Sequence, residues 1–201
     1  MAFLGITVPF SIPTMLPEKA PSRENTEMVV RLNKLLSSPV IDFPHITIVI
    51  FGKDLASSAI GRLLDPILEA TSGMQPFEVS TSRITVFEPK GDSTPLISLI
   101  DSQDLHWLHK RVREACDEEG IEYAKTFAEY RPHTTLEYLG KEAYANWEGD
   151  ILFPPISWRV SEIKLFGGDE GAERLVVTFP LGAPRTKEAS WRAFVRVTQR
   201  W

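Results

Sequence analysis

Two short segments of this chain repeat one pattern, in which proline, histidine, any residue, threonine and an apolar residue follow one another. The first copy contains His45 and Thr47, and the second contains His133 and Thr135. Because side chains alternate between the two faces of an extended strand, each copy projects its imidazole and its hydroxyl to the same side. Two imidazoles can supply a general base and a general acid, and the hydroxyls can hold charged oxygens. Together the four residues are typical of in-line displacement at phosphorus.

The sequence leaves the division of labour between the two imidazoles open. Imidazole titrates near neutral pH, so either His45 or His133 can be the base while the other is the acid. The alternative is a chance repeat, although both copies follow a proline and open an apolar strand. The reaction needs no metal and no other cofactor. The remaining histidines, His106 and His109, lie three residues apart with no identifiable carboxylate partner, which favours a solvated helix face over a metal site.

Length and composition indicate an ordinary globular protein. The chain has 201 residues, of which 43% are hydrophobic and 24% charged, so we expect one domain or two small lobes that share a core. The net charge is −5, and no basic cluster precedes the C-terminal tail. Since binding of a long duplex depends on many basic contacts to phosphates, this charge favours a nucleotide or a short oligonucleotide as partner.

Several features favour a reducing, soluble compartment, and we expect the cytoplasm. Cys116 is the single cysteine, so it cannot form an intramolecular disulfide, and its place in a helical pattern favours a buried thiol. No apolar run approaches the roughly 18 residues that a membrane span needs. The apolar N-terminus has no basic leader and is interrupted by Pro9 and Pro13, which indicates a strand. We further expect a monomer without a membrane partner.

Hydrophobic periodicity predicts an α+β chain with an internal duplication, in which a helix precedes each histidine-containing strand and strands with hairpin character follow. Expected helices cover residues 28–36 and 54–71, the latter kinked or divided at Pro66, and a third runs from its N-cap Ser102 to its stop signal Gly120. Further strands are expected over residues 45–51, 77–87, 95–100, 133–139, 156–166 and 174–179. The turn-like residues 88–93 favour a hairpin between the strands over 77–87 and 95–100.

Residues 183–201 differ from the preceding residues 1–182 and form a basic and aromatic tail. The tail carries five basic side chains against the single acid Glu188, interleaved with Trp191, Phe194 and Trp201. Three interpretations stay open: a terminal helix docked on the body, a lid or stacking platform over a nucleotide, and a segment that binds a partner.

The paired motifs resemble those of the two-histidine (2H) phosphoesterase superfamily, which includes 2′,5′ RNA ligases and cyclic phosphodiesterases. The resemblance extends to residues 96–100, 104–112, 130–136, 160–166 and 174–179, and it covers roughly residues 2–181. It implies a duplicated two-lobe α+β fold, with antiparallel sheets lining a central cleft and helices on the outside. It also implies that His45 and His133 are catalytic, and that Thr47 and Thr135 hold the non-bridging phosphate oxygens without any cofactor.

Residues beside the second motif are further candidates for substrate binding. If the strand pattern extends upstream of His133, the Arg131 side chain shares its face and can pair with a phosphate, or it belongs to the rim. Tyr130 precedes the motif and can stack on a base, or it belongs to the core. Thr134 points to the opposite face, which favours a structural role.

The motifs and the resemblance predict a metal-independent phosphodiesterase for RNA-type phosphates. Expected substrates carry a 2′,3′-cyclic phosphate or are 2′,5′-linked or cyclic oligonucleotides, and the motifs do not choose among them. Two alternatives stay open: a non-catalytic nucleotide- or RNA-binding module of the same fold, and a structural domain in which the repeat is a coincidence.

Overall fold

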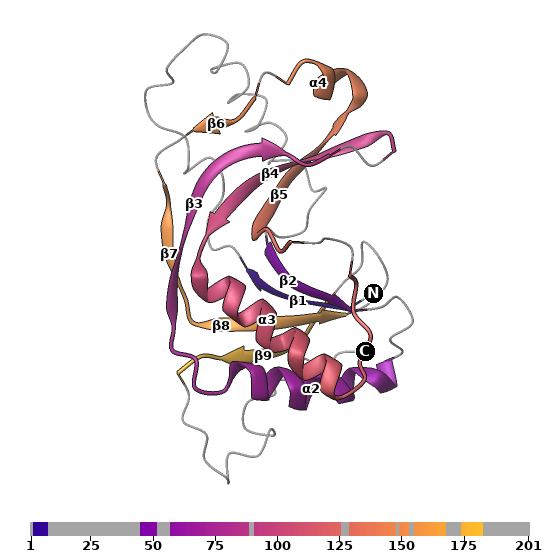
Figure 1. Ribbon diagram of the computed structural model, residues 1–201, viewed down its shortest axis with the longest axis vertical. Coiled ribbons are helices and arrows are strands. Elements are labelled where there is room, and N and C mark those ends of the chain that lie inside the picture. The colour runs from indigo at the N-terminus through magenta and orange to yellow at the C-terminus, as the bar shows by residue number, and fades with distance from the viewer. Residues whose placement is uncertain are drawn as a thin grey trace.

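The computed structural model describes residues 2–7, 45–51, 57–88, 91–125, 129–147, 149–152, 155–167 and 174–182. In chain order its elements are β1 (Ala2–Thr7), β2 (His45–Phe51), α2 (Ser57–Thr71), β3 (Phe77–Val86), β4 (Ser93–Asp101), α3 (Gln103–Glu118), β5 (His133–Gly140), α4 (Lys141–Ala145), β6 (Ile151–Leu152), β7 (Ser157–Val160), β8 (Glu162–Gly167) and β9 (Arg174–Pro180). Figure 1 shows an antiparallel sheet with helices beside it, so the expected α+β class is confirmed. The expected helix over residues 28–36 and the tail over residues 183–201 lie outside the described residues, and the domain boundary at residue 182 stays a prediction.

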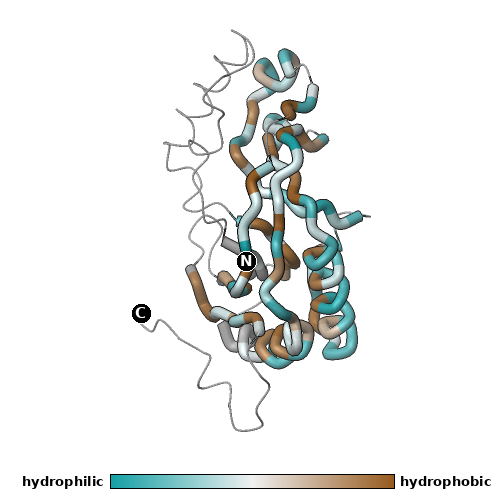
Figure 2. Tube along the Cα trace, turned by 90° about the vertical axis from the view of Figure 1, so that its left-hand side faces the viewer, coloured by the Kyte–Doolittle hydropathy of each residue, from teal (hydrophilic) through white to brown (hydrophobic). Residues whose placement is uncertain are grey.

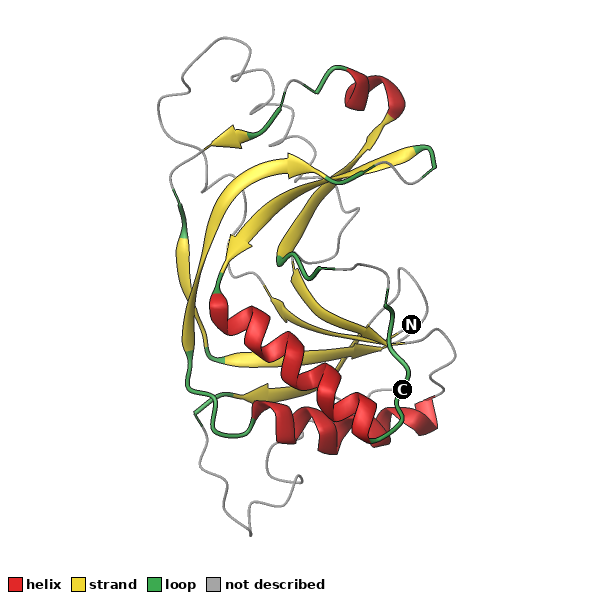
Figure 3. Cartoon of the chain, viewed as in Figure 1, coloured by secondary structure: helices red, strands yellow, loops and turns green. Residues whose placement is uncertain are grey.

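The described strands form one nine-stranded antiparallel sheet, which curves strongly in Figure 3. Its order is β6-β3-β4-β5-β2-β1-β8-β9, and β7 pairs with β3. The expected hairpin of β3 and β4 is confirmed. The strands that carry the two motifs, β2 and β5, are neighbours in the middle of the sheet although they are far apart in the sequence.

The strand expected over residues 156–166 is in fact two strands. β7 pairs with β3, whereas β8 pairs with β1 in the other half of the sheet. Buried Val160 and buried Ile163 are separated by two exposed residues, so the alternation slips by one position at this point. That slip marks where the chain leaves one half of the sheet and enters the other.

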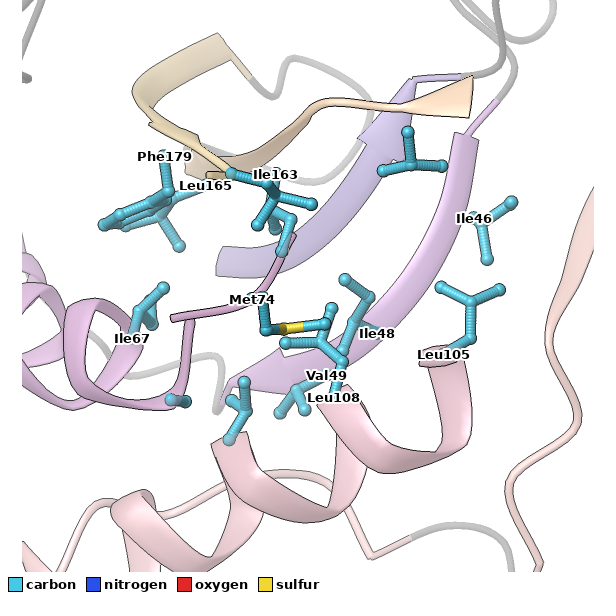
Figure 4. Packing of buried hydrophobic residues seen from close by; sticks show 14 of the residues in the cluster. Ile46, Ile48, Val49, Ile67, Met74, Leu105, Leu108, Ile163, Leu165 and Phe179 are labelled. Atoms are coloured by element: carbon cyan, nitrogen blue, oxygen red, sulfur yellow. The ribbon is translucent and has the colours of Figure 1, made fainter. Parts of the chain in front are cut away.

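A large hydrophobic core joins α2 and α3 to the half of the sheet that contains β2, β8 and β9. In this core Leu105 and Leu108 of α3 pack with Ile46 and Ile48 of β2, as Figure 4 shows. Because these two isoleucines face the helix, the strand turns the histidine and threonine of the first motif to the opposite face. The helices therefore fix the direction in which the first motif points.

The boundaries of α3 and the state of its cysteine agree with the expectations. The Ser102 hydroxyl accepts a hydrogen bond from the Leu105 amide at 3.3 Å, which confirms the N-cap. Gly120, with φ of 63°, follows the helix as its stop residue. Cys116 is fully buried, and burial raises the pKa of its thiol to about 11.

Figure 2 shows hydrophilic residues interspersed along the outer sides of the helices. No helix in the described ranges is long and apolar enough to cross a membrane.

A second, smaller core lies in the other half of the sheet, where Ile84, Leu96, Leu136 and Leu139 pack with side chains of α4. Two cores, one in each half, are consistent with the expected two lobes. The helix α3 departs from a simple duplication, however. It precedes β5 in the chain, but its buried side chains lie in the core beneath β2.

Candidate active site

One backbone pairing brings the two motifs to the same face of the sheet. β2 and β5 run antiparallel with Ile46 opposite Thr134, and both of these side chains are buried. Residues directly opposite each other in an antiparallel pair share a face, so the residues that flank them share the other face. The histidine and the threonine of each motif are these flanking residues, and all four are half-buried.

The same register determines how the four residues are spaced. With Ile46 opposite Thr134, the antiparallel direction of the strands puts His45 on the side of Thr135 and Thr47 on the side of His133. The two histidines are diagonal neighbours, and Cα atoms in such positions are about 7–8 Å apart. The two imidazoles therefore project from one face of two neighbouring strands.

The main chain just before the second motif holds His133 in place. Its Nδ1 lies 2.7 Å from the carbonyl oxygen of Arg131. Since a carbonyl oxygen only accepts hydrogen bonds, Nδ1 carries a proton, and in the neutral ring the lone pair is on Nε2. The ring of Phe87 meets the imidazole edge-on, with centroids 4.6 Å apart. The sequence did not reveal either contact, because a backbone carbonyl leaves no sequence signal and Phe87 ends the strand predicted over residues 77–87, whose apolar pattern needs no further explanation.

The surroundings of His133 favour its neutral form. Burial lowers its pKa below the usual 6.5, and the charge of His45 lowers it further, whereas the hydrogen bond to the Arg131 carbonyl acts in the opposite direction. Because the net effect is a lowered pKa, the ring is neutral at pH 7.

A β-bulge follows each motif. The pairing of β2 with β1 shifts so that Ile48 is the extra residue, and the pairing of β5 with β4 shifts so that Leu136 is the extra residue. These are the apolar residues that end the two copies of the pattern. A bulge bends its strand and redirects the side chains beside it, and bulges are frequent next to active sites. The repeat therefore extends from the sequence to the backbone.

Tyr130 joins the two motif strands. Its hydroxyl donates a hydrogen bond to the Thr47 carbonyl at 3.0 Å, and its ring lies against His109 with centroids 4.0 Å apart. Burial raises the pKa of this hydroxyl, which keeps it protonated. These contacts are structural, and stacking of Tyr130 on a base stays a prediction.

Arg131 contributes its backbone to the site, whereas its side chain is exposed. Its Nε lies 3.8 Å from a carboxylate oxygen of Glu129. A phosphate contact by this guanidinium stays a prediction.

Thr134 lies on the face opposite the motifs, as expected, and is 1% exposed. It faces Ser98 of β4, which is also buried. Neither hydroxyl has a hydrogen-bond partner among the described residues. Both hydroxyls lie on the face of the sheet opposite the motifs, that of Thr134 on a motif strand and that of Ser98 on the neighbouring strand β4.

Two cavities in the described part of the structure lie away from the motif residues. One, of about 360 Å³, is lined by outward side chains of α3, His106 and His109 among them, and by Tyr130. The other, of about 560 Å³, lies beside Trp107 where α2 leads into β3. Burial, with the charges of Arg113 and His106, lowers the pKa of His109 to about 4. Within the described ranges, no three histidine, cysteine or acidic side chains form a group that could hold a metal.

Comparison with solved structures finds the same fold in other proteins. TT0787 of Thermus thermophilus is similar at a TM-score of 0.63 and 16% identity, over 90% of this chain and 97% of that one. LigT of Escherichia coli is similar in its complexes with ATP, at a TM-score of 0.54 and 14% identity, and with NADP+, at 0.51 and 15%. These two matches cover 90% of this chain and 96% of LigT. Identities this low demonstrate a shared fold alone.

A search of curated proteins finds no match to this sequence. The sequence pattern of the 2′-5′ RNA ligase superfamily, in contrast, matches residues 39–172, a span that holds both motifs and most of the described strands. The resemblance to two-histidine phosphoesterases is thereby confirmed, and the chain belongs to the 2′-5′ RNA ligase superfamily.

Proposed function

We propose that this protein is a metal-independent phosphodiesterase for RNA-type phosphates. Its substrates are nucleotides with a 2′,3′-cyclic phosphate, or short oligonucleotides that are 2′,5′-linked or cyclic. The observation that carries the proposal is the pairing of Ile46 with Thr134, because it gathers both motifs on one face of the sheet. Membership of a superfamily of phosphoesterases supports the same reaction class.

In the hydrolytic direction His133 is the general base and His45 the general acid. A water molecule attacks phosphorus while Nε2 of His133 takes its proton. The bond from phosphorus to the leaving ribose oxygen breaks, and protonated His45 gives that oxygen a proton. The neutral state of His133 and its protonated Nδ1 support this assignment, since Nε2 is then free to accept a proton. The roles exchange when the reaction runs in reverse.

Thr47 and Thr135 donate hydrogen bonds to the non-bridging oxygens of the phosphate. The two hydroxyls lie on neighbouring strands and on the face that carries the histidines, so the two donors approach the phosphate from both strands. Negative charge grows on these oxygens as the nucleophile attacks, and fixed donors stabilise that charge more than they stabilise the ground state.

Nucleotide binding by a protein of the same fold supports this substrate class. LigT of Escherichia coli was solved in complex with ATP and with NADP+. The net charge of −5 favours a short ligand over a long duplex. A monomer in the cytoplasm remains our expectation for the working state.

A turnover assay with 2′,3′-cyclic nucleotides and 2′,5′-linked oligoadenylate tests the proposal. His45→Ala and His133→Ala should each lower kcat by roughly 10²- to 10⁴-fold, the usual contribution of a general acid or base. His106→Ala removes an exposed imidazole on α3 and serves as the matched control with unchanged turnover. Nucleotide binding without turnover by the wild-type protein would replace the proposal with a non-catalytic binding module, and absence of both would leave a structural domain.

A further inference from the structure

The first motif belongs to a row of residues that crosses four strands. Thr47 of β2 is paired with Gly5 of β1, Gly5 is paired with Lys164 of β8, and Lys164 is paired with Thr178 of β9. Paired residues in antiparallel strands share a face, so all four residues lie on the face that carries the motifs. The four strands lie side by side in this order in the sheet of Figure 1. Thr47, Gly5, Lys164 and Thr178 are called the β2–β9 row below.

Burial supports this assignment of faces. Thr47, Lys164 and Thr178 are half-buried, whereas the residue on either side of each is buried. The buried neighbours belong to the large core beneath α2 and α3: Ile46, Ile48, Ile163, Leu165, Val177 and Phe179. The side chains of Thr47, Lys164 and Thr178 therefore point away from that core, on the face of the sheet that carries the motifs.

Gly5 places bare backbone between Thr47 and Lys164. Gly5 itself is buried, and the pairing of β1 with β2 shifts between Leu4 and Gly5, where a glycine inside a strand often marks such a bulge. Strands are spaced 4.7–4.9 Å apart, so Thr47 and Lys164 are roughly 9.5 Å apart with no side chain between them. Lys164 is therefore two strands away from the threonine that we propose holds the reacting phosphate.

Lys164 brings a positive charge to the far side of Gly5. Its side chain is 20% exposed, and its Nζ lies 2.8 Å from a carboxylate oxygen of Glu162 on the same strand. An ammonium group has three N–H donors, so this ion pair, the one that the described residues make with Lys164, does not use all of them. A second phosphate held there would satisfy the remaining donors while the first phosphate lies between the two histidines.

We propose that Lys164 forms a subsite for a second phosphate of the substrate. The inference rests on the proposed function and narrows its substrate class. The preferred substrate carries a phosphate group besides the one that reacts, as a 5′-phosphorylated nucleoside 2′,3′-cyclic phosphate or an oligonucleotide does. A nucleoside 2′,3′-cyclic phosphate with a free 5′-hydroxyl reacts without this contact.

Equilibrium binding tests the subsite without requiring turnover. Adenosine 3′,5′-bisphosphate should bind the wild-type protein about 10- to 100-fold more tightly than adenosine 3′-monophosphate, the range expected for hydrogen bonds to a charged group. Lys164→Met should remove most of this preference and leave the monophosphate affinity within about two-fold. Lys164→Arg retains the charge and should retain the preference. Lys110→Met, an exposed lysine on α3, is the matched control and should change neither affinity.

Three results would overturn the subsite: no preference in the wild-type protein, a preference that survives Lys164→Met, or an equal loss of both affinities in a folded Lys164→Met protein. Failure of the proposed function is a different result. In that case the wild-type protein would show the Lys164-dependent preference in binding but would not turn over adenosine 2′,3′-cyclic phosphate with or without a 5′-phosphate.

Discussion

At the scale of single residues, the chemistry of the site depends on how His133 is held. The Arg131 carbonyl binds the Nδ1 proton, and burial next to Phe87 disfavours the charged ring. An imidazole with one nitrogen fixed and a lowered pKa is suited to accept a proton through Nε2 at neutral pH. The structure thus separates two histidines that the repeated sequence presents as equivalents.

The interaction between the two imidazoles gives a prediction about titration. The charge of His45 lowers the pKa of His133, so His45→Ala should raise the pKa of His133 toward 6.5. Proton NMR of the ring resonances in the wild-type and variant proteins measures this shift. A pKa of His133 that is unchanged or lower in the variant would mean that the two rings do not face each other.

Thr134 and Thr135 are adjacent, but their substitutions should have opposite consequences. Thr134→Val removes a buried hydroxyl without a hydrogen-bond partner, so the free energy of unfolding should stay constant or rise by up to about 1 kcal/mol. Thr135→Val removes a proposed phosphate donor, so kcat should fall by roughly 10²-fold while stability is kept. Urea unfolding and turnover assays of both variants provide the comparison. Loss of activity in Thr134→Val with none in Thr135→Val would show that the faces are assigned wrongly.

At the scale of elements, the two motif strands are joined by few contacts. β2 and β5 share the Ile46–Thr134 pairing, and the Tyr130 hydroxyl adds a hydrogen bond to the Thr47 carbonyl. The bulges after both motifs turn the strands locally. The relative position of the histidines therefore depends on a small number of contacts between the two strands, and a substitution of Tyr130 tests one of them.

Tyr130→Phe removes the hydroxyl that links the two strands. The free energy of unfolding should fall by about 0.5–1.5 kcal/mol, the contribution of one hydrogen bond, and kcat should fall because the motifs lose their alignment. Tyr123→Phe is the matched control, since its hydroxyl binds the Asp117 carboxylate at 2.9 Å, away from the motifs. It should lose similar stability but keep its kcat. Equal kcat values in the two variants would contradict a positioning role for Tyr130.

Local patterns predicted the elements and one hairpin, but they did not predict the pairings between segments that are distant in the sequence. The strand of the first motif, the cap at Ser102 and the hairpin of β3 and β4 follow from propensity and periodicity, which act over a few residues. The pairing of β2 with β5 and the packing of α3 beneath β2 join distant segments, and no local pattern encodes such contacts. The slip in alternation after Val160 was visible in principle, but it is a single position.

In the candidate site, too, the local features were predictable from the sequence and the contacts between distant segments were not. The sequence pattern placed each histidine and its threonine on one side of a strand, because alternation is a local property. It could not indicate the Arg131 carbonyl, which belongs to the backbone, or the β2–β9 row, which depends on the pairing of four strands.

At the scale of the whole molecule, an acidic protein of the 2′-5′ RNA ligase superfamily presents two histidines and one lysine on a shared sheet face. The proposed reaction uses these side chains for proton transfer and charge stabilisation, without a metal ion. Turnover of a 2′,3′-cyclic nucleotide should therefore be unchanged after treatment with EDTA and removal of the chelator. Loss of activity that one divalent ion restores would refute the metal-independent mechanism.

The dependence of kcat/KM on pH, measured with a 2′,3′-cyclic nucleotide, tests the central claim most directly. The wild-type profile should be bell-shaped, because the base must be unprotonated and the acid protonated in the same molecule. Since the pKa of His133 is lowered, its acidic limb should lie below pH 6.5. That limb should vanish from the residual activity of His133→Ala, and the basic limb should vanish from that of His45→Ala. A wild-type rate that changes in one direction only across the neutral range, or a bell that both variants keep, would contradict paired catalysis by the two histidines.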